Sequence, residues 1–185
     1  MINIDNIGNL KKCRIWTEKP PLTECKVVKT LNLIEETNEH ICCKSKNIAV
    51  ELFVAPRYYA FLGVEYIFQK TNNLEFCVNI TEDSDKVLTD SLALPSDNVH
   101  LGISDEYAET ILNTAVKIGK NISALPSGIL IFNIGGYSDY GSNQVIFSKV
   151  TSMLVRLLVA KQDSINLEQL KTIVRNELKK SLTDI

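Results

Sequence analysis

Few residues of this chain have the types and spacing that metal chemistry needs. The two histidines are His40 and His100, and the five cysteines have irregular spacing: Cys13, Cys25, Cys42, Cys43 and Cys77. An odd, irregular set argues against a disulfide framework. Residues 40–43 hold one histidine and two cysteines, but no Cys-x-x-Cys pair occurs, and zinc sites use two such ligand pairs. We therefore expect ordinary thiols, no metal and no cofactor.

Motifs for covalent or acid–base catalysis are also lacking. No Gly-x-Ser-x-Gly occurs, and His100, between Val99 and Leu101, fits a strand or loop residue better than a general base. The acidic pair Glu35–Glu36 fits solvated charge, because adjacent helix residues do not face one another. The sequence therefore predicts a protein that is not an enzyme.

A glycine-bounded loop at residues 135–142 follows an apolar segment and precedes an expected helix. Such a loop can bind an anion at the helix N-terminus. The spacing of Gly136 and Gly141 matches half of a P-loop, but Ser142 and Asn143 replace its Lys-Ser/Thr pair, so no lysine would hold the phosphates. The Gly-x-Gly-x-x-Gly fingerprint is absent too, and we expect no nucleotide site.

One cluster, Arg57-Tyr58-Tyr59, combines a cation with aromatic rings. Arginine and tyrosine can stack on unpaired bases and bridge phosphates. The same residues suit a strand edge whose tyrosines simply cover a sheet. The sequence leaves both interpretations open.

The composition is that of an ordinary folded protein. Hydrophobic residues make up 45% and charged residues 23%, and 20 Lys and Arg against 22 Asp and Glu give a net charge of −2. This excludes a disordered chain, a collagen-like chain and a uniformly basic nucleic-acid binder. The first residues have neither a basic nor an apolar leader, and no apolar run is long enough to span a bilayer. We expect a cytoplasmic protein that does not bind membranes.

Strand patterns dominate the first half of the chain. We expect a hairpin of residues 58–71 and 74–80, with period-two alternation on its return strand. Residues 81–98 are acidic and polar, which predicts a long, solvated, flexible loop. Shorter strands are expected at residues 11–16, 25–30 and 47–54.

Helices surround one strand in the second half. Ser104 is suited to cap a helix that begins at Asp105, with acidic residues in its first turn. The apolar run 129–134 is typical of a central strand covered on both faces. Further helices are expected at residues 143–160 and 167–182. This order predicts an α+β fold with helices packed on one face of a sheet.

Residues 135–156 resemble domain IV of elongation factor G, the ribosomal translocase. The family segment GSYHDVDSSE aligns without a gap with GGYSDYGSNQ at residues 135–144. Residues 103–107, ISDEY, resemble the family's I-P-x-E-Y at the start of the preceding helix. The matching positions are Gly135, Tyr137, Asp139, Ser142, Phe147, Ser152 and Met153, and Arg156 replaces a lysine.

The resemblance covers about residues 57–158. It implies a β-α-β-α domain at 57–160, with helices on one face of a mostly antiparallel four-stranded sheet and a left-handed crossover, against the usual rule. Residues 1–56 would form a strand-rich extension packed on this domain, and residues 161–185 a C-terminal helix. Ser138 replaces the family's tip histidine, Gly141 its second aspartate, and residues 55–59 its glycine-rich segment. No GTPase motif occurs, which excludes a complete translocase.

The resemblance implies a free-standing, non-enzymatic, translation-factor-like module that binds the ribosome or ribosomal RNA through a tip loop at residues 135–143. Asp139 would repel phosphate unless an Asx-type bond holds it within the loop. The alternative is a protein-interaction or regulatory module that reuses the fold without binding RNA, with a sheet edge or apolar loop as its surface. The residues expected to contact RNA are Arg57, Tyr58, Tyr137, Ser138, Tyr140 and Asn143.

Overall fold

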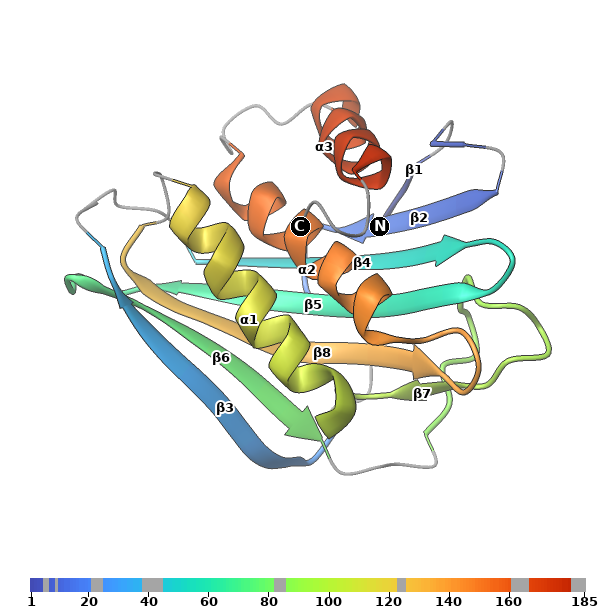
Figure 1. The fold of residues 1–185 in the computed structure, drawn as a ribbon, viewed down its shortest axis with the longest axis horizontal. Helices are drawn as coiled ribbons and strands as arrows, with labels where there is room; N and C mark the ends of the chain where they lie inside the picture. The colour runs from blue at the N-terminus through green and yellow to red at the C-terminus, as the bar shows by residue number, and fades with distance from the viewer. Residues whose placement is uncertain are drawn as a thin grey trace.

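The computed structural model describes residues 1–4, 7–8, 10–20, 25–37, 45–81, 86–122, 126–160 and 167–180. It has an α+β fold, in which three helices pack against one mixed, mostly antiparallel sheet of eight strands (Figure 1). The elements in chain order are β1 (Ile2–Ile4), β2 (Lys11–Trp16), β3 (Val27–Glu36), β4 (Lys46–Val54), β5 (Tyr58–Phe68), β6 (Asn73–Thr81), β7 (Val99–Leu101), α1 (Asp105–Asn121), β8 (Gly128–Ser138), α2 (Gln144–Val159) and α3 (Leu167–Lys179).

The order of strands across the sheet is β1-β2-β4-β5-β8-β6-β3, and β7 pairs with the end of β8. The expected hairpin between β5 and β6 is wrong, because β8 lies between them, antiparallel to β5 and parallel to β6. The apolar run of β8 needs cover on both faces, and a central place provides it. Residues 57–160 contribute four strands, β5 to β8, and the four strands of residues 1–56 extend them into one eight-stranded sheet, in which β4 pairs with β5 and β3 pairs with β6.

The connection from β6 to β8 is left-handed. In Figure 1 the arrows of the parallel strands β6 and β8 both point to the right, and β8 lies above β6. Between them, α1 runs back to the left in front of the sheet. About 98% of crossovers between parallel strands are right-handed. This chain path is therefore uncommon.

The three predicted helices are present, and their apolar stripes form the main core. The Ser104 side chain accepts a hydrogen bond from the Glu106 backbone and caps α1. α2 buries its stripe against β4, β5 and α1, with Phe147 and Met153 fully enclosed. α3 packs on α2, where the Ser152 hydroxyl donates to the Glu177 carboxylate at 2.6 Å. The expected end of α3, at residues 181–182, lies outside the described residues.

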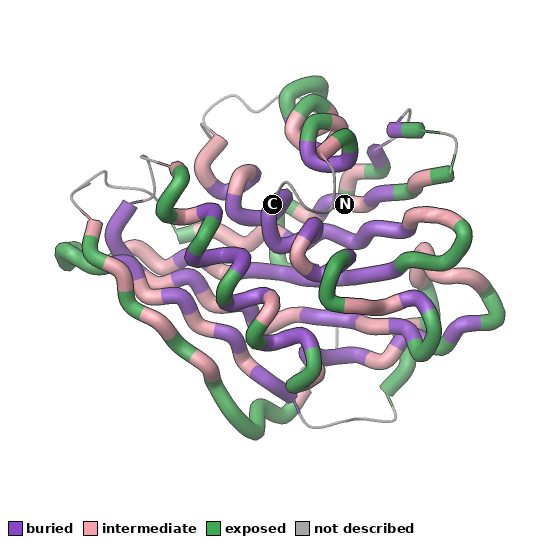
Figure 2. Tube along the Cα trace, viewed as in Figure 1, coloured by how far each residue is buried: buried purple, intermediate pink, exposed green. Residues whose placement is uncertain are grey.

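The other face of the sheet carries a smaller core of Ala49, Tyr59, Phe61 and Val99. Residues 86–98 cover it with Leu88, Leu92 and Ala93, so this part of the expected solvated loop packs on the sheet instead. The reason is that β5 is apolar on both faces, as the buried trace of that strand in Figure 2 shows. Residues 82–85 lie outside the described part of the chain.

Candidate functional site

Two turns meet at one end of the sheet, on the right in Figure 1. One joins β4 to β5, and the other joins β8 to α2. The Tyr59 backbone N–H donates to the Gly141 carbonyl at 3.0 Å, and the Ser142 hydroxyl donates to the Tyr59 carbonyl at 2.7 Å. These bonds hold the turns side by side. We call residues 55–58 and 139–143 together the tip.

Gly141 makes this close approach possible. A Cβ atom there would lie 2.1 Å from the Arg57 carbonyl oxygen and 2.6 Å from the Ser138 Oγ atom. No side chain fits such a gap, so the position requires glycine. The Gly141 backbone N–H also donates to Ser138 Oγ at 2.8 Å, which tightens the turn.

The exposed turn is shorter than the loop that we expected at residues 135–143. Residues 135–138 belong to β8, where β5 and β7 pair with them and continue the ladder. Ser138 is only 2% exposed and supports the turn, so it is not available for contact with RNA. Tyr137 lies between the rings of His100 and Tyr107, at centroid distances of 5.4 and 5.9 Å. Tyr137 therefore packs within the fold rather than standing free for base stacking.

Three of the predicted residues are exposed at the tip. The Arg57 guanidinium lies over the Tyr140 ring, 5.4 Å from its centroid, and Tyr140 is 68% exposed. Tyr58, next to Arg57, is 46% exposed. We call Arg57, Tyr58 and Tyr140 the contact patch. Asn143 is partly buried, and its side-chain oxygen accepts from the Ile146 backbone at 3.0 Å as the N-cap of α2.

Asp139 is the one acidic residue of the tip. Its carboxylate pairs with the His100 ring at 2.8 Å, across the β7–β8 edge. This contact stands where we expected an Asx-type bond. It directs the carboxylate toward His100.

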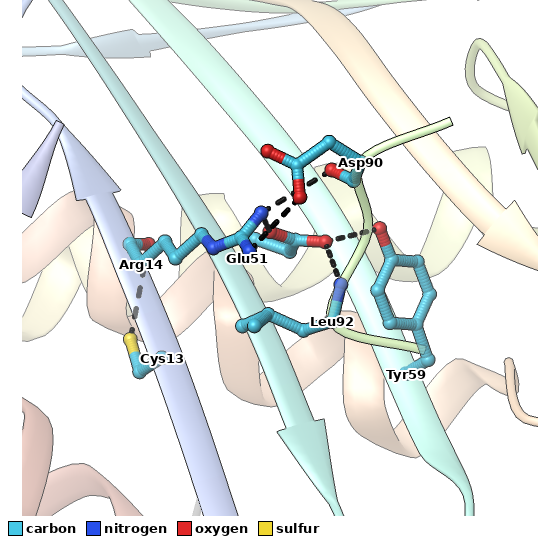
Figure 3. Close-up of polar contacts among 6 residues, drawn as sticks. All are labelled: Cys13, Arg14, Glu51, Tyr59, Asp90 and Leu92. Atoms are coloured by element: carbon cyan, nitrogen blue, oxygen red, sulfur yellow. Dashed lines mark hydrogen bonds and ion pairs between the residues drawn. The ribbon is translucent and has the colours of Figure 1, made fainter. Parts of the chain in front are cut away.

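A buried glutamate behind the tip has no counterpart among the residues that the sequence nominated. Glu51 is fully buried on the face opposite the helices, as Figure 3 shows. Its Oε1 atom accepts from the Tyr59 hydroxyl at 2.9 Å and from the Leu92 backbone at 2.7 Å, while Arg14 approaches Oε2 at 3.4 Å. Burial raises the pKa of this carboxyl. The only sequence signal was a glutamate inside the apolar strand β4.

The partners of Glu51 are all groups of the protein itself, which assigns it a structural role. It fixes the covering segment 86–98 through Leu92 and holds Tyr59 against this face of the sheet. Because successive strand residues point to opposite faces, Tyr58 must face the helix side. Glu51 therefore orients the start of β5, where Tyr58 of the contact patch lies.

In the described part of the chain, no three histidine, cysteine, aspartate or glutamate side chains gather closely enough to hold a metal ion. His40, Cys42 and Cys43, the cluster weighed as metal ligands, lie outside the described residues. None of the described helices has the length and apolar character that crossing a bilayer requires.

Comparison of the chain with protein-family models, curated proteins and solved structures found no match. The basis for assigning a function is therefore the geometry of the tip, together with the residues that resemble domain IV of elongation factor G.

Proposed function

We propose that this protein is a non-enzymatic, translation-factor-like module that binds ribosomal RNA through the contact patch. The observation that carries the proposal is the position of the Arg57 guanidinium over the exposed ring of Tyr140, within cation–π distance. The two residues come from turns more than eighty positions apart in the chain, and the bonds around Gly141 hold them together.

The chemistry of this pair suits unpaired RNA. An exposed tyrosine offers a platform for a base, and stacking on such a ring contributes about 1–3 kcal/mol per base. The guanidinium can extend the platform or bind a phosphate through two parallel hydrogen bonds. Tyr58 adds a second exposed ring at the same end of the sheet.

The chain path supports the same proposal. The left-handed β6–α1–β8 connection, followed by a tight turn and α2, is the arrangement implied by the resemblance to domain IV of elongation factor G. In that family the tip reaches the decoding region of the small ribosomal subunit. Here the burial of Ser138 moves the contact from that position to Tyr140 and the β4–β5 turn.

The charge distribution sets the expected strength of binding. The net charge is −2, so no field of the whole molecule attracts phosphates. Among the described residues, the tip carries Arg57, and Lys11 and Lys149 lie beside Tyr58. Each phosphate neutralised on single-stranded RNA contributes about −0.7 to the slope of log K against log salt. We therefore expect log K to fall only slowly with log salt, because base stacking rather than phosphate binding supplies most of the binding free energy.

Co-sedimentation with purified ribosomes tests the proposal. At about 50 mM salt we expect the wild-type protein to pellet with ribosomes and to be released progressively as salt increases. Tyr140→Ala and Arg57→Glu should each weaken binding about tenfold, which corresponds to ~1.4 kcal/mol. Lys70→Glu is the matched control for Arg57→Glu, because Lys70 is exposed just beyond the far end of β5. Absence of wild-type co-sedimentation at this salt, or equal binding by the tip variants, would refute the proposal.

A second candidate function is protein binding at the sheet edge. β3 is a ten-residue edge strand, exposed or half-exposed along its whole length (Figure 2). It presents Val28 and Ile34, 55% and 57% exposed, and such an edge can accept an added strand from a partner. Ile34→Lys should then abolish capture of a specific protein partner while leaving ribosome binding unchanged. Equal capture by the variant would remove this candidate.

A further inference from the structure

A cavity of about 240 Å³ opens beside the contact patch, and the proposed function does not use it. It lies between the β4–β5 turn, the first two turns of α2 and the end of α3. Its walls are mostly apolar and include Val54, Val145 and Leu178, with the Tyr58 ring on one side. We call this cavity the α2 pocket.

Two lysines line the α2 pocket. Lys149 is only 6% exposed, and its ammonium donates to the Lys180 carbonyl at 2.8 Å. An ammonium has three N–H donors, so one bond leaves two for a further acceptor. Lys11 enters the same cavity from β2. Burial and the neighbouring Lys11 charge lower the pKa of Lys149.

These walls select a ligand that joins a flat apolar part to an anion. Pockets for drug-sized ligands measure roughly 300–1,000 Å³, so a cavity of about 240 Å³ suits a single ring system. The apolar walls and the Tyr58 ring suit the faces of that ring, and the two ammonium groups suit a phosphate. A nucleotide has both parts joined in one unit.

The position of the pocket favours RNA over a free small molecule. Tyr58 both lines the cavity and belongs to the contact patch, directly after Arg57 in the chain. A strand that stacks on Tyr140 can therefore continue past Tyr58 without leaving the surface. We propose that the α2 pocket takes one unstacked base of the bound RNA, with the phosphate of that nucleotide on Lys11 and Lys149. This inference rests on the proposed function, and it adds a specific site for a single nucleotide.

Filling the cavity tests the inference. Val145 lies on the rim and is 42% exposed, so Val145→Trp should block the pocket without disturbing the core. The matched control is Val28→Trp on β3, at a position that is 55% exposed. Fluorescence anisotropy with a short labelled oligouridylate at about 50 mM salt should show binding weakened about tenfold by Val145→Trp and unchanged by Val28→Trp. Circular dichroism melting verifies that both variants fold.

A second variant keeps the test independent of the added tryptophan. Lys11→Gln leaves the cavity open and removes one phosphate contact, so the salt slope should fall by about 0.7. In methyl spectra of the wild-type protein, uridine monophosphate should shift the signals of Val54, Val145 and Leu178, whereas N-acetylphenylalanine should not. Shifts with N-acetylphenylalanine alone would overturn the inference in favour of a peptide carboxylate.

The outcomes separate the two proposals. The α2 pocket is not a nucleotide site if oligouridylate binds the wild type and Val145→Trp equally, or if uridine monophosphate shifts none of the three methyl signals. Either result leaves the proposed binding of RNA by the contact patch standing. If oligouridylate and ribosomes both fail to bind the wild type, the proposed function itself is refuted.

Discussion

Replacing Glu51 by leucine should destabilise the protein by removing the acceptor that joins the tip to the segment behind it. The Tyr59 hydroxyl and the Leu92 N–H share Oε1 of Glu51, at 2.9 and 2.7 Å. A buried donor left unpaired costs about 1–3 kcal/mol, and two donors are affected. Burying a carboxylate is itself unfavourable, so its removal offsets part of this cost. Arg14 loses Glu51 as a partner but still donates to the Asp90 carboxylate at 3.1 Å. We expect a net loss of about 2–4 kcal/mol.

Glutamine at position 51 separates the hydrogen bonds from the charge. Its single carbonyl oxygen can accept from both Tyr59 and Leu92, so Glu51→Gln should cost much less than Glu51→Leu. The pKa of Glu51 is raised above its ordinary value of 4.5, which means that the folded state holds this proton more tightly than the unfolded state. The associated stability is present in full below the ordinary pKa and is lost as the pH rises through the folded pKa. The wild type should therefore gain stability relative to Glu51→Gln on acidification.

Urea unfolding followed by tryptophan fluorescence measures these differences. Trp16 is the single tryptophan, and its ring lies 5.3 Å from Phe61 on the same face of the sheet as Glu51. Far-ultraviolet circular dichroism should give a coincident transition if unfolding is two-state. A Glu51→Leu variant within about 0.5 kcal/mol of the wild type would refute the structural role of Glu51. A wild-type advantage over Glu51→Gln that does not grow towards acid would refute its raised pKa.

Three further predictions concern the tip, the α1 cap and the core. Gly141→Ala places a methyl group against the Arg57 carbonyl, so it should lower the free energy of unfolding by about 1–3 kcal/mol and abolish ribosome co-sedimentation. Normal stability and normal binding would contradict the close approach of the two turns. Ser104→Ala removes the cap of α1 and should lower stability by about 1 kcal/mol, or Tm by about 2–4 °C, as calorimetry would show; an unchanged Tm would argue against the cap. Burial raises the pKa of the Cys13 thiol to about 12, so iodoacetamide should leave Cys13 unmodified in the native protein and alkylate it in urea. Peptide mass spectrometry would detect the difference, and equal modification in both states would contradict the burial of Cys13.

The elements that the sequence predicted best are those set by local patterns. β2 has the predicted bounds, residues 11–16. α1 begins after Ser104 because a short polar side chain there can cap the first turn, and α2 follows Asn143 for the same reason. The apolar run of β8 predicted its central place because a strand with two apolar faces must be covered twice.

The errors arose where a distant part of the chain decided the outcome. The alternation in β6 predicts which of its faces is buried, but not which strand lies beside it, and β8 occupies the place expected for β5. Residues 86–98 have the composition of a solvated loop, yet the apolar outer face of β5 draws Leu88 and Leu92 onto it. The same distant pairing, with β5 and β7, converts residues 135–138 from loop into strand.

The sequence by itself determined the α+β class, the Ser104 cap and the apolar stripes of the helices, because each follows from interactions between near neighbours in the chain. Only the tertiary structure decided that Arg57 lies on Tyr140, that Ser138 is enclosed, and that Glu51 anchors Tyr59 and Leu92. The Arg57–Tyr140 and Glu51–Leu92 contacts join segments more than forty residues apart in the chain, and the Glu51–Tyr59 bond joins two neighbouring strands. Such partners follow from the order of strands in the sheet, and no local pattern encodes that order.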